Sequence, residues 1–70
     1  MEATGETSLL GYGAAKAWLE EQGGFWLVTD FDGARLIVVS AWGRSGQAVI
    51  EGGDERAAFV RAVWALRTSL

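Results

Sequence analysis

Histidine, cysteine, proline and asparagine are all missing from this chain of 70 residues. Without His and Cys, the usual zinc sites, haem ligation by those residues, thiol nucleophiles and imidazole bases are excluded. A small secreted fold held by disulfide bonds is excluded as well. The remaining candidate bases are carboxylates, Lys16 and Tyr12, which do not converge in the sequence. We therefore expect a cytoplasmic protein that is not an enzyme and needs no cofactor or metal.

Charge and hydropathy narrow the possible partners. The net charge is −3 at pH 7, which disfavours nonspecific binding to nucleic acid. Acidic residues dominate positions 1–32, where Lys16 is the one basic residue, so we expect a protein partner with a basic surface. The first residues lack a basic segment followed by an apolar one, and no apolar run approaches the ~18–20 residues of a membrane helix. We expect neither a signal peptide nor a membrane span.

The length and the apolar content predict one small folded domain. Half of the residues are hydrophobic and four are Trp, which is typical of a chain that folds. A chain this short buries only about 60% of its unfolded surface, so its core alone gives marginal stability. Because disulfides and metals are excluded, we expect association, most simply as a homodimer. We assign residues 1–7 to a flexible tail and residues 8–70 to the domain.

Periodicity and turn residues predict an α+β fold. A helix is expected over 9–22, capped by Thr7 or Ser8 and ended by two glycines, and a second helix follows the capping residue Asp54 as far as Thr68. Apolar, β-branched segments predict strands at 25–31, 35–42 and 47–51. The expected architecture is a three-stranded antiparallel sheet in α-β-β-β-α order, with both helices packed on one sheet face.

The turns set the expected strand register. Asp32-Gly33 favours a two-residue type I′ turn, which places Asp30 opposite Arg35. A looser turn over 43–46 would bring Ala41 near Ala48. One sheet face then carries the predicted core, which consists of Trp26, Val28, Ile37, Val39, Ala41, Ala48 and Ile50.

The opposite sheet face is the predicted surface for self-association or for binding a partner protein. Monomers rarely expose a contiguous apolar patch larger than a few hundred Å², and Trp is enriched at the centres of interfaces. A second apolar surface is expected on the flank of the last helix. The sheet face, with Trp42 as its anchor, is preferred over that flank. The candidate binding residues are Phe25, Leu27, Leu36, Val38, Trp42 and Val49 on the sheet and Val60 and Trp64 on the helix.

Residues 29–34, Thr-Asp-Phe-Asp-Gly-Ala, resemble the first motif of the haloacid-dehalogenase-type phosphotransferases. The resemblance implies a nucleophile at Asp30, an acid or base at Asp32 and a Mg²⁺ ion between them. That family has Thr after the glycine and a much longer doubly wound sheet. We favour the structural interpretation, in which the Asp-Gly pair forms a hairpin turn and Asp30 pairs with Arg35.

The predicted element order also resembles that of double-stranded-RNA-binding domains. Those domains have a His-containing loop after the first strand and a Lys cluster at the start of the last helix. This chain has Asp32-Gly33 and Asp54-Glu55-Arg56 in those places. The resemblance implies an alternative function as a degenerate RNA-binding-like domain or another nucleic-acid-associated protein.

The prediction that we prefer is a small non-enzymatic protein-interaction module that binds and inhibits or regulates a partner protein. Inhibitors of bacterial machinery that phages and mobile elements encode, anti-CRISPR proteins among them, share this small acidic profile. The likeness is one of size and composition, not of a motif.

Overall fold

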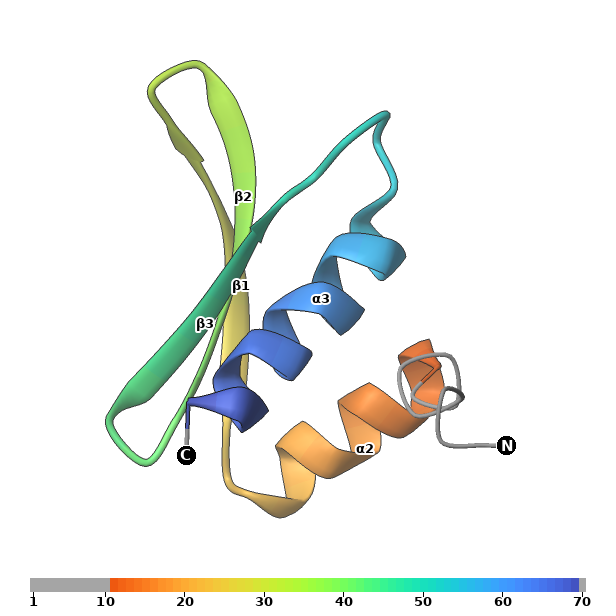
Figure 1. Ribbon diagram of the computed structural model, residues 1–70, viewed down its shortest axis with the longest axis vertical. Helices are drawn as coiled ribbons and strands as arrows, with labels where there is room; N and C mark the ends of the chain where they lie inside the picture. The colour runs from red at the N-terminus through yellow and green to blue at the C-terminus, as the bar shows by residue number, and fades with distance from the viewer. Residues whose placement is uncertain (1–10, 70) are drawn as a thin grey trace.

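The computed structural model describes residues 11–69, and their element order confirms the predicted α+β class. The expectations for the tail over 1–7, for a cap at Thr7 or Ser8 and for Leu70 lie outside the described residues. Three antiparallel strands stand between two helices (Figure 1). The elements are α2 (Tyr12–Glu21), β1 (Phe25–Phe31), β2 (Ala34–Ala41), β3 (Arg44–Val49) and α3 (Glu55–Thr68).

The first hairpin has the predicted register. Asp32 and Gly33 both adopt positive φ, at 54° and 82°, as a type I′ turn requires. Asp30 lies opposite Arg35, and the Arg35 Nε donates to the Asp30 Oδ1 over 3.3 Å. Both side chains are exposed, so this ion pair contributes at most about 1 kcal/mol. The aspartates therefore occupy the structural positions that the hairpin interpretation gives them.

The second hairpin differs from the prediction. The turn is not a loop over 43–46 but the two-residue pair Trp42-Gly43, with φ of 56° and 75°, and β3 consequently begins at Arg44. Ala48 pairs with Ile37 instead of Ala41. Positive φ is rare for a bulky residue, so the sequence does not predict a turn at Trp42. The β2–β3 register differs from the predicted one by an even number of residues, so each β3 residue still lies on its predicted face.

Helix α3 packs directly across β2 and β3. The Asp54 carboxylate caps it by accepting from the Ala57 amide over 3.1 Å. Gly46 of β3 is buried beneath the helix, and a Cβ at this position would collide with the Ala62 carbonyl oxygen and the Leu66 amide nitrogen. The absence of a side chain therefore brings the two backbones into contact. The buried side chains of the helix are Ala58, Phe59, Ala62, Val63 and Leu66.

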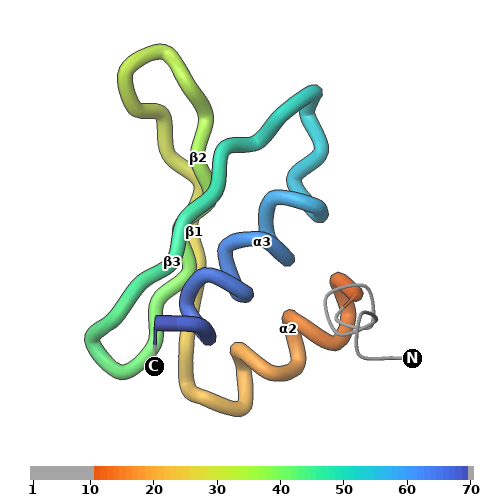
Figure 2. The backbone as a smooth tube through the Cα atoms, in the orientation of Figure 1, coloured from red at the N-terminus to blue at the C-terminus, as the bar shows by residue number. Residues whose placement is uncertain are grey.

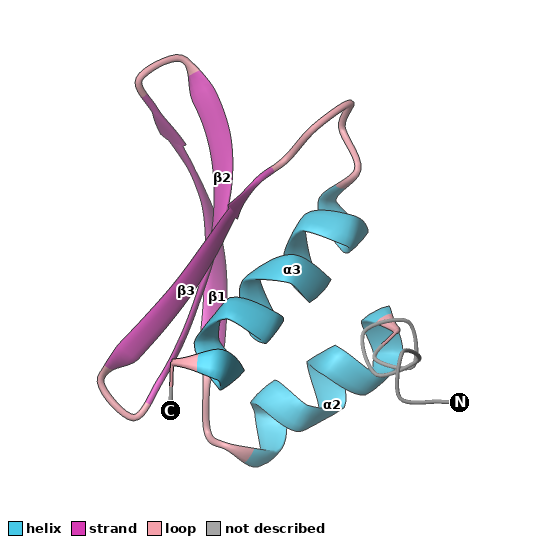
Figure 3. Ribbon diagram, in the orientation of Figure 1, coloured by secondary structure: helices cyan, strands magenta, loops and turns pink. Residues whose placement is uncertain are grey.

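Helix α2 lies on the same side of the sheet as α3 but farther from it (Figures 1 and 2). It packs mainly on α3, and its buried residues are Ala15 and Leu19. Both helices therefore share one side of the sheet, as predicted (Figure 3). We call the sheet face toward the helices the inner face and the opposite one the outer face.

The inner face is incompletely covered at β1. Val28, predicted as core, is 40% exposed, because α3 covers β2 and β3 while α2 packs on α3. Trp26 is half-buried, and its ring meets the Phe59 ring edge to face at 5.0 Å. The buried part of the sheet is formed by Ile37, Val39 and Ala41 of the middle strand and Gly46 of β3.

Candidate functional site: the outer face of the sheet

The outer face carries no charged side chain on any of its three strands. Strand alternation and the pairing register place alternate residues of each strand on it. Within residues 11–69, no helix packs against this face, since both helices lie on the other side (Figure 3). Its members are Phe25, Leu27, Thr29 and Phe31 of β1, Ala34, Leu36, Val38 and Ser40 of β2, and Ser45, Gln47 and Val49 of β3.

The largest apolar side chains of the outer face are open to solvent. Phe25 is 61% exposed and Phe31 is 69% exposed at opposite ends of β1, and Leu27 between them is 49% exposed. Val49 is 43% exposed on β3, opposite the half-buried Leu36 of the middle strand. The apolar surface is therefore continuous from one edge strand to the other.

Five of the eight predicted binding residues meet on this face. Leu27 pairs with Val38, and Leu36 pairs with Val49, so these four side chains form two adjacent cross-strand rows. Phe25 extends the patch at the start of β1. The structure thus brings together the sheet residues that sequence alternation had grouped.

Trp42 lies at the end of the face, in the β2–β3 turn. The prediction placed it within a strand. It is 49% exposed, and its ring meets the Trp18 ring of α2 edge to face, with 5.7 Å between the centroids. A shallow hollow of about 430 Å³ separates it from Phe25. A second hollow of about 280 Å³ lies farther along the outer face, lined by Phe31, Leu36 and Val38 among others. Both hollows are open enough to receive side chains of another molecule.

Val60 and Trp64, the predicted binding residues on α3, do not join this surface. Val60 packs against the core from its edge. Trp64 is half-buried, and the Arg67 guanidinium lies 5.2 Å from the centre of its ring. The helix flank therefore presents less apolar surface than the sheet does.

Phe31 and Val28 are exposed apolar residues that the predicted binding set lacks. Phe31 shares the alternation of Phe25 and Leu27, so its place on the outer face could have been read from the sequence. Val28 could not, because its exposure depends on where the helices dock.

Acidic residues border one end of the outer face. Asp32 is in the β1–β2 turn at this end. Glu51 follows β3 beside the same turn, because the Ile50 amide donates to the Arg35 carbonyl at the start of β2 over 2.8 Å. At the opposite end, the Arg44 guanidinium donates to the Ser69 carbonyl over 2.7 Å. The face is therefore neutral at its centre and acidic at one rim.

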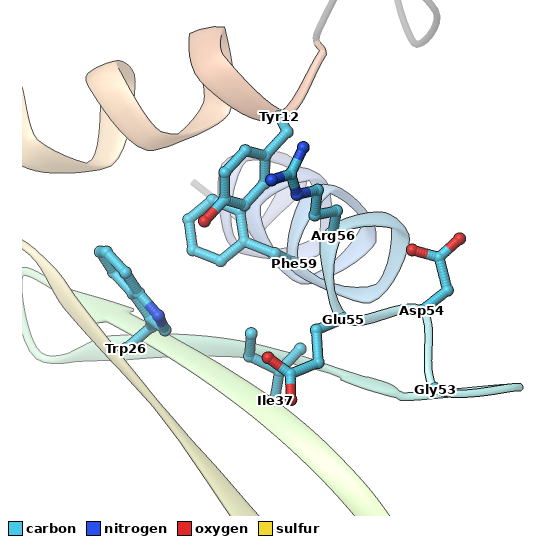
Figure 4. Close-up of a pocket in the computed structure, with 8 residues that line it drawn as sticks. All are labelled: Tyr12, Trp26, Ile37, Gly53, Asp54, Glu55, Arg56 and Phe59. Atoms are coloured by element: carbon cyan, nitrogen blue, oxygen red, sulfur yellow. The ribbon is translucent and has the colours of Figure 1, made fainter.

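A separate cavity of about 390 Å³ opens between the helices and the inner face (Figure 4). Tyr12 and Trp26 form its aromatic walls, and Glu55 and Ile37 also line it. The Arg56 guanidinium stacks over the Tyr12 ring at 5.1 Å. Aromatic rings and a carboxylate suit a cationic or planar group. The lining offers carboxylates and a phenol but no nucleophile paired with a base.

Comparison with protein-family models, with curated proteins and with solved structures finds no match to this chain. Among residues 11–69, no three His, Cys, Asp or Glu side chains gather closely enough to hold a metal ion. Neither described helix has the length and apolar character needed to cross a membrane.

Proposed function

We propose that this protein is a non-enzymatic interaction module that binds a partner protein through the outer face of its sheet and thereby inhibits or regulates it. The observation that carries the proposal is the outer face itself, which is apolar, free of charge and uncovered within the described residues. A soluble monomer gains nothing from such a surface, whereas a partner that covers it gains hydrophobic free energy.

The exposed aromatic side chains can supply a large part of a specific interface. At ~150–250 Å² per aromatic side chain, the exposed parts of Phe25, Phe31 and Trp42 alone amount to roughly 300–450 Å². A standard protein–protein interface buries about 800 Å² on each partner, so these three side chains supply roughly half of one side.

The backbone at Trp42 supports a binding role for this residue. A left-handed conformation costs a non-glycine residue roughly 1–2 kcal/mol, and Asn or Gly would avoid that cost in a type I′ turn. Such an outlier, observed in a structure, is a reason to look for function. An exposed Trp beside an open hollow has the character of an interfacial hot spot.

The acidic rim favours a partner with basic residues around an apolar centre. Opposite charges at a rim mainly accelerate encounter, so association with the partner slows as salt rises. This agrees with the acidic bias of the first 32 residues, although the centre of the interface is neutral.

A photo-crosslinking experiment tests the proposal. A photoreactive side chain is placed at Val49 on the outer face, or at Ala65, an exposed position on α3, and the full chain is expressed in its source cells. A partner protein crosslinks at position 49 and not at position 65. The same partner, once purified, binds the Val49→Glu variant at least tenfold more weakly and the matched Ala65→Glu control with unchanged affinity.

Two results would contradict the proposal. One is equal binding of the partner by the Val49→Glu and Ala65→Glu variants, which would remove the outer face from the interface. The other is tight, steeply salt-dependent binding of duplex RNA at about 0.15 M salt, which would favour the nucleic-acid alternative.

A further inference from the structure

Strand β1 is the least covered element of the described chain. All of its residues except Trp26 are exposed, although its sequence, Phe-Trp-Leu-Val-Thr-Asp-Phe, is typical of a buried strand. It forms one edge of the sheet. Its outer side belongs to the open outer face. On its inner side Trp26 packs on Phe59 of α3, but Val28 stays 40% exposed.

Within residues 11–69, the β1 edge has none of the usual protection against pairing with another strand. Exposed edges are commonly guarded by Pro, Lys, a bulge or a covering segment. β1 has seven residues in unbroken register with β2 and a single charge, at Asp30. The opposite edge is guarded, because α3 packs on β3 and the Arg61 guanidinium donates to the Val49 carbonyl over 2.8 Å.

The register identifies the backbone groups that face outward from β1. The Ile50 amide donates to the Arg35 carbonyl, so the peptide groups of Arg35 point toward β3. Antiparallel strands alternate the direction of these groups residue by residue. The backbone groups that bond toward β1, to its odd-numbered residues, therefore belong to Ala34, Leu36, Val38 and Ser40. The N–H and C=O groups that point away from β2 belong to Trp26, Val28 and Asp30.

We propose that β1 pairs with β1 of a second copy, antiparallel about a twofold axis at Val28, and so forms a continuous six-stranded sheet. With the axis at Val28, this residue faces its own mate, and Trp26 faces Asp30 of the second copy. All three outward-facing residues of each strand are then paired. Since each such pair exchanges two hydrogen bonds, about six bonds join the strands.

Side chains are complementary in the same register. On the outer face, Phe25 comes opposite Phe31 of the second copy, twice over, and aromatic cross-strand pairs are favourable. On the inner face, the exposed Val28 side chain is covered by its mate. The strand is thus matched to itself, which favours a second copy over a different protein.

Charge complementarity also favours a second copy. The Lys16 ammonium lies 5.8 Å from the centre of the Trp26 ring, and Trp26 is the residue that faces Asp30 of the second copy. The register therefore brings a cation of one copy near a carboxylate of the other at two symmetric positions. The inference goes beyond the proposed function, because it uses the sheet edge and leaves the outer face free.

Single-cysteine crosslinking tests the pairing, because the chain contains no Cys. Hydrogen-bonded residues across an antiparallel pair have Cα atoms ~5.5 Å apart, within the range that a disulfide spans. Under mild oxidation, Val28→Cys forms a covalent dimer. Val49→Cys, a matched control with similar exposure on the outer face, crosslinks at least tenfold more slowly. Sedimentation of the unmodified full chain shows a dimer.

Charge reversal supplies a second test. Lys16→Glu weakens the dimer about tenfold, since it faces Asp30 of the other copy, and the double variant Lys16→Glu with Asp30→Lys restores it. A chain that sediments as a monomer up to about 200 μM overturns the inference. So does crosslinking of Val49→Cys as fast as Val28→Cys, or failure of the double variant to restore the dimer. A monomeric chain, or failure of the double variant, leaves the proposed partner binding untouched, whereas rapid crosslinking of Val49→Cys would make a second copy the occupant of the outer face.

Discussion

Replacing Gly46 with Ala tests the contact on which the whole fold depends. The new Cβ would overlap the Ala62 carbonyl oxygen and the Leu66 amide nitrogen. Both are backbone atoms of α3, so neither moves aside as a flexible side chain would. The helix has to rise from β3, and the contacts of Phe59, Val63 and Leu66 with the sheet loosen with it.

The expected loss in the free energy of unfolding is about 2–4 kcal/mol, at or above the upper part of the range for overpacked cores. At ~4–8 °C per kcal/mol for a domain of this size, the melting temperature falls by roughly 8–32 °C. Urea denaturation followed by Trp fluorescence, together with calorimetry, measures both quantities.

Gly13→Ala in α2 is the matched control. No atom lies within 4 Å of a Cβ at Gly13, so the substitution adds helix propensity without a clash and raises stability by roughly 0.5–1 kcal/mol. If Gly46→Ala leaves stability within about 0.5 kcal/mol of the unmodified chain, α3 does not sit on β3 as described and the reasoning is refuted.

Three further substitutions separate structural from binding roles. Trp42→Asn creates an Asn-Gly turn, so relief of ~1–2 kcal/mol of backbone cost offsets part of the lost contact with Trp18. The free energy of unfolding, measured by urea titration, changes by at most about 2 kcal/mol, while affinity for the partner falls more than tenfold. A loss of stability without a loss of affinity would show that Trp42 serves only the fold. Asp54→Ala removes the α3 cap and lowers the free energy of unfolding by about 0.5–2 kcal/mol, and an unchanged denaturation midpoint would show that the cap contributes nothing. Asp30→Asn leaves partner binding through the outer face unchanged in a titration. If the unmodified chain had a metal-dependent phosphatase activity that this change abolished, the phosphotransferase interpretation would be revived.

Local signals in the sequence predicted the first hairpin and α3 well. Asp32-Gly33 specifies a type I′ turn through residues that tolerate positive φ, and this turn fixed the whole β1–β2 register. Asp54 is a strong capping residue, and the apolar stripe that follows it is the buried face of α3. In both cases, the residues that decide the structure are neighbours in the sequence.

The remaining features depend on contacts between distant segments. The Trp42-Gly43 turn carries a bulky side chain at positive φ, where the Trp18 ring of α2 packs against it. The exposure of Val28 depends on α2 docking on α3 instead of on β1. Of the candidate site, alternation predicted the shared face of Phe25, Leu27, Leu36, Val38 and Val49, but it carries no information on which faces the helices leave open.

The packing of α3 on β2 and β3 has a consequence for biosynthesis. Residues 34–69 contain every buried apolar side chain of the described chain except Ala15 and Leu19. α2 and β1 leave the ribosome first, yet the helix and the strand on which they pack are made afterwards. The amino-terminal half of the domain therefore has no surface on which to pack until then, and β1 is exposed during synthesis. The native packing of α2 and β1 can therefore form only after β2, β3 and α3 have been synthesised.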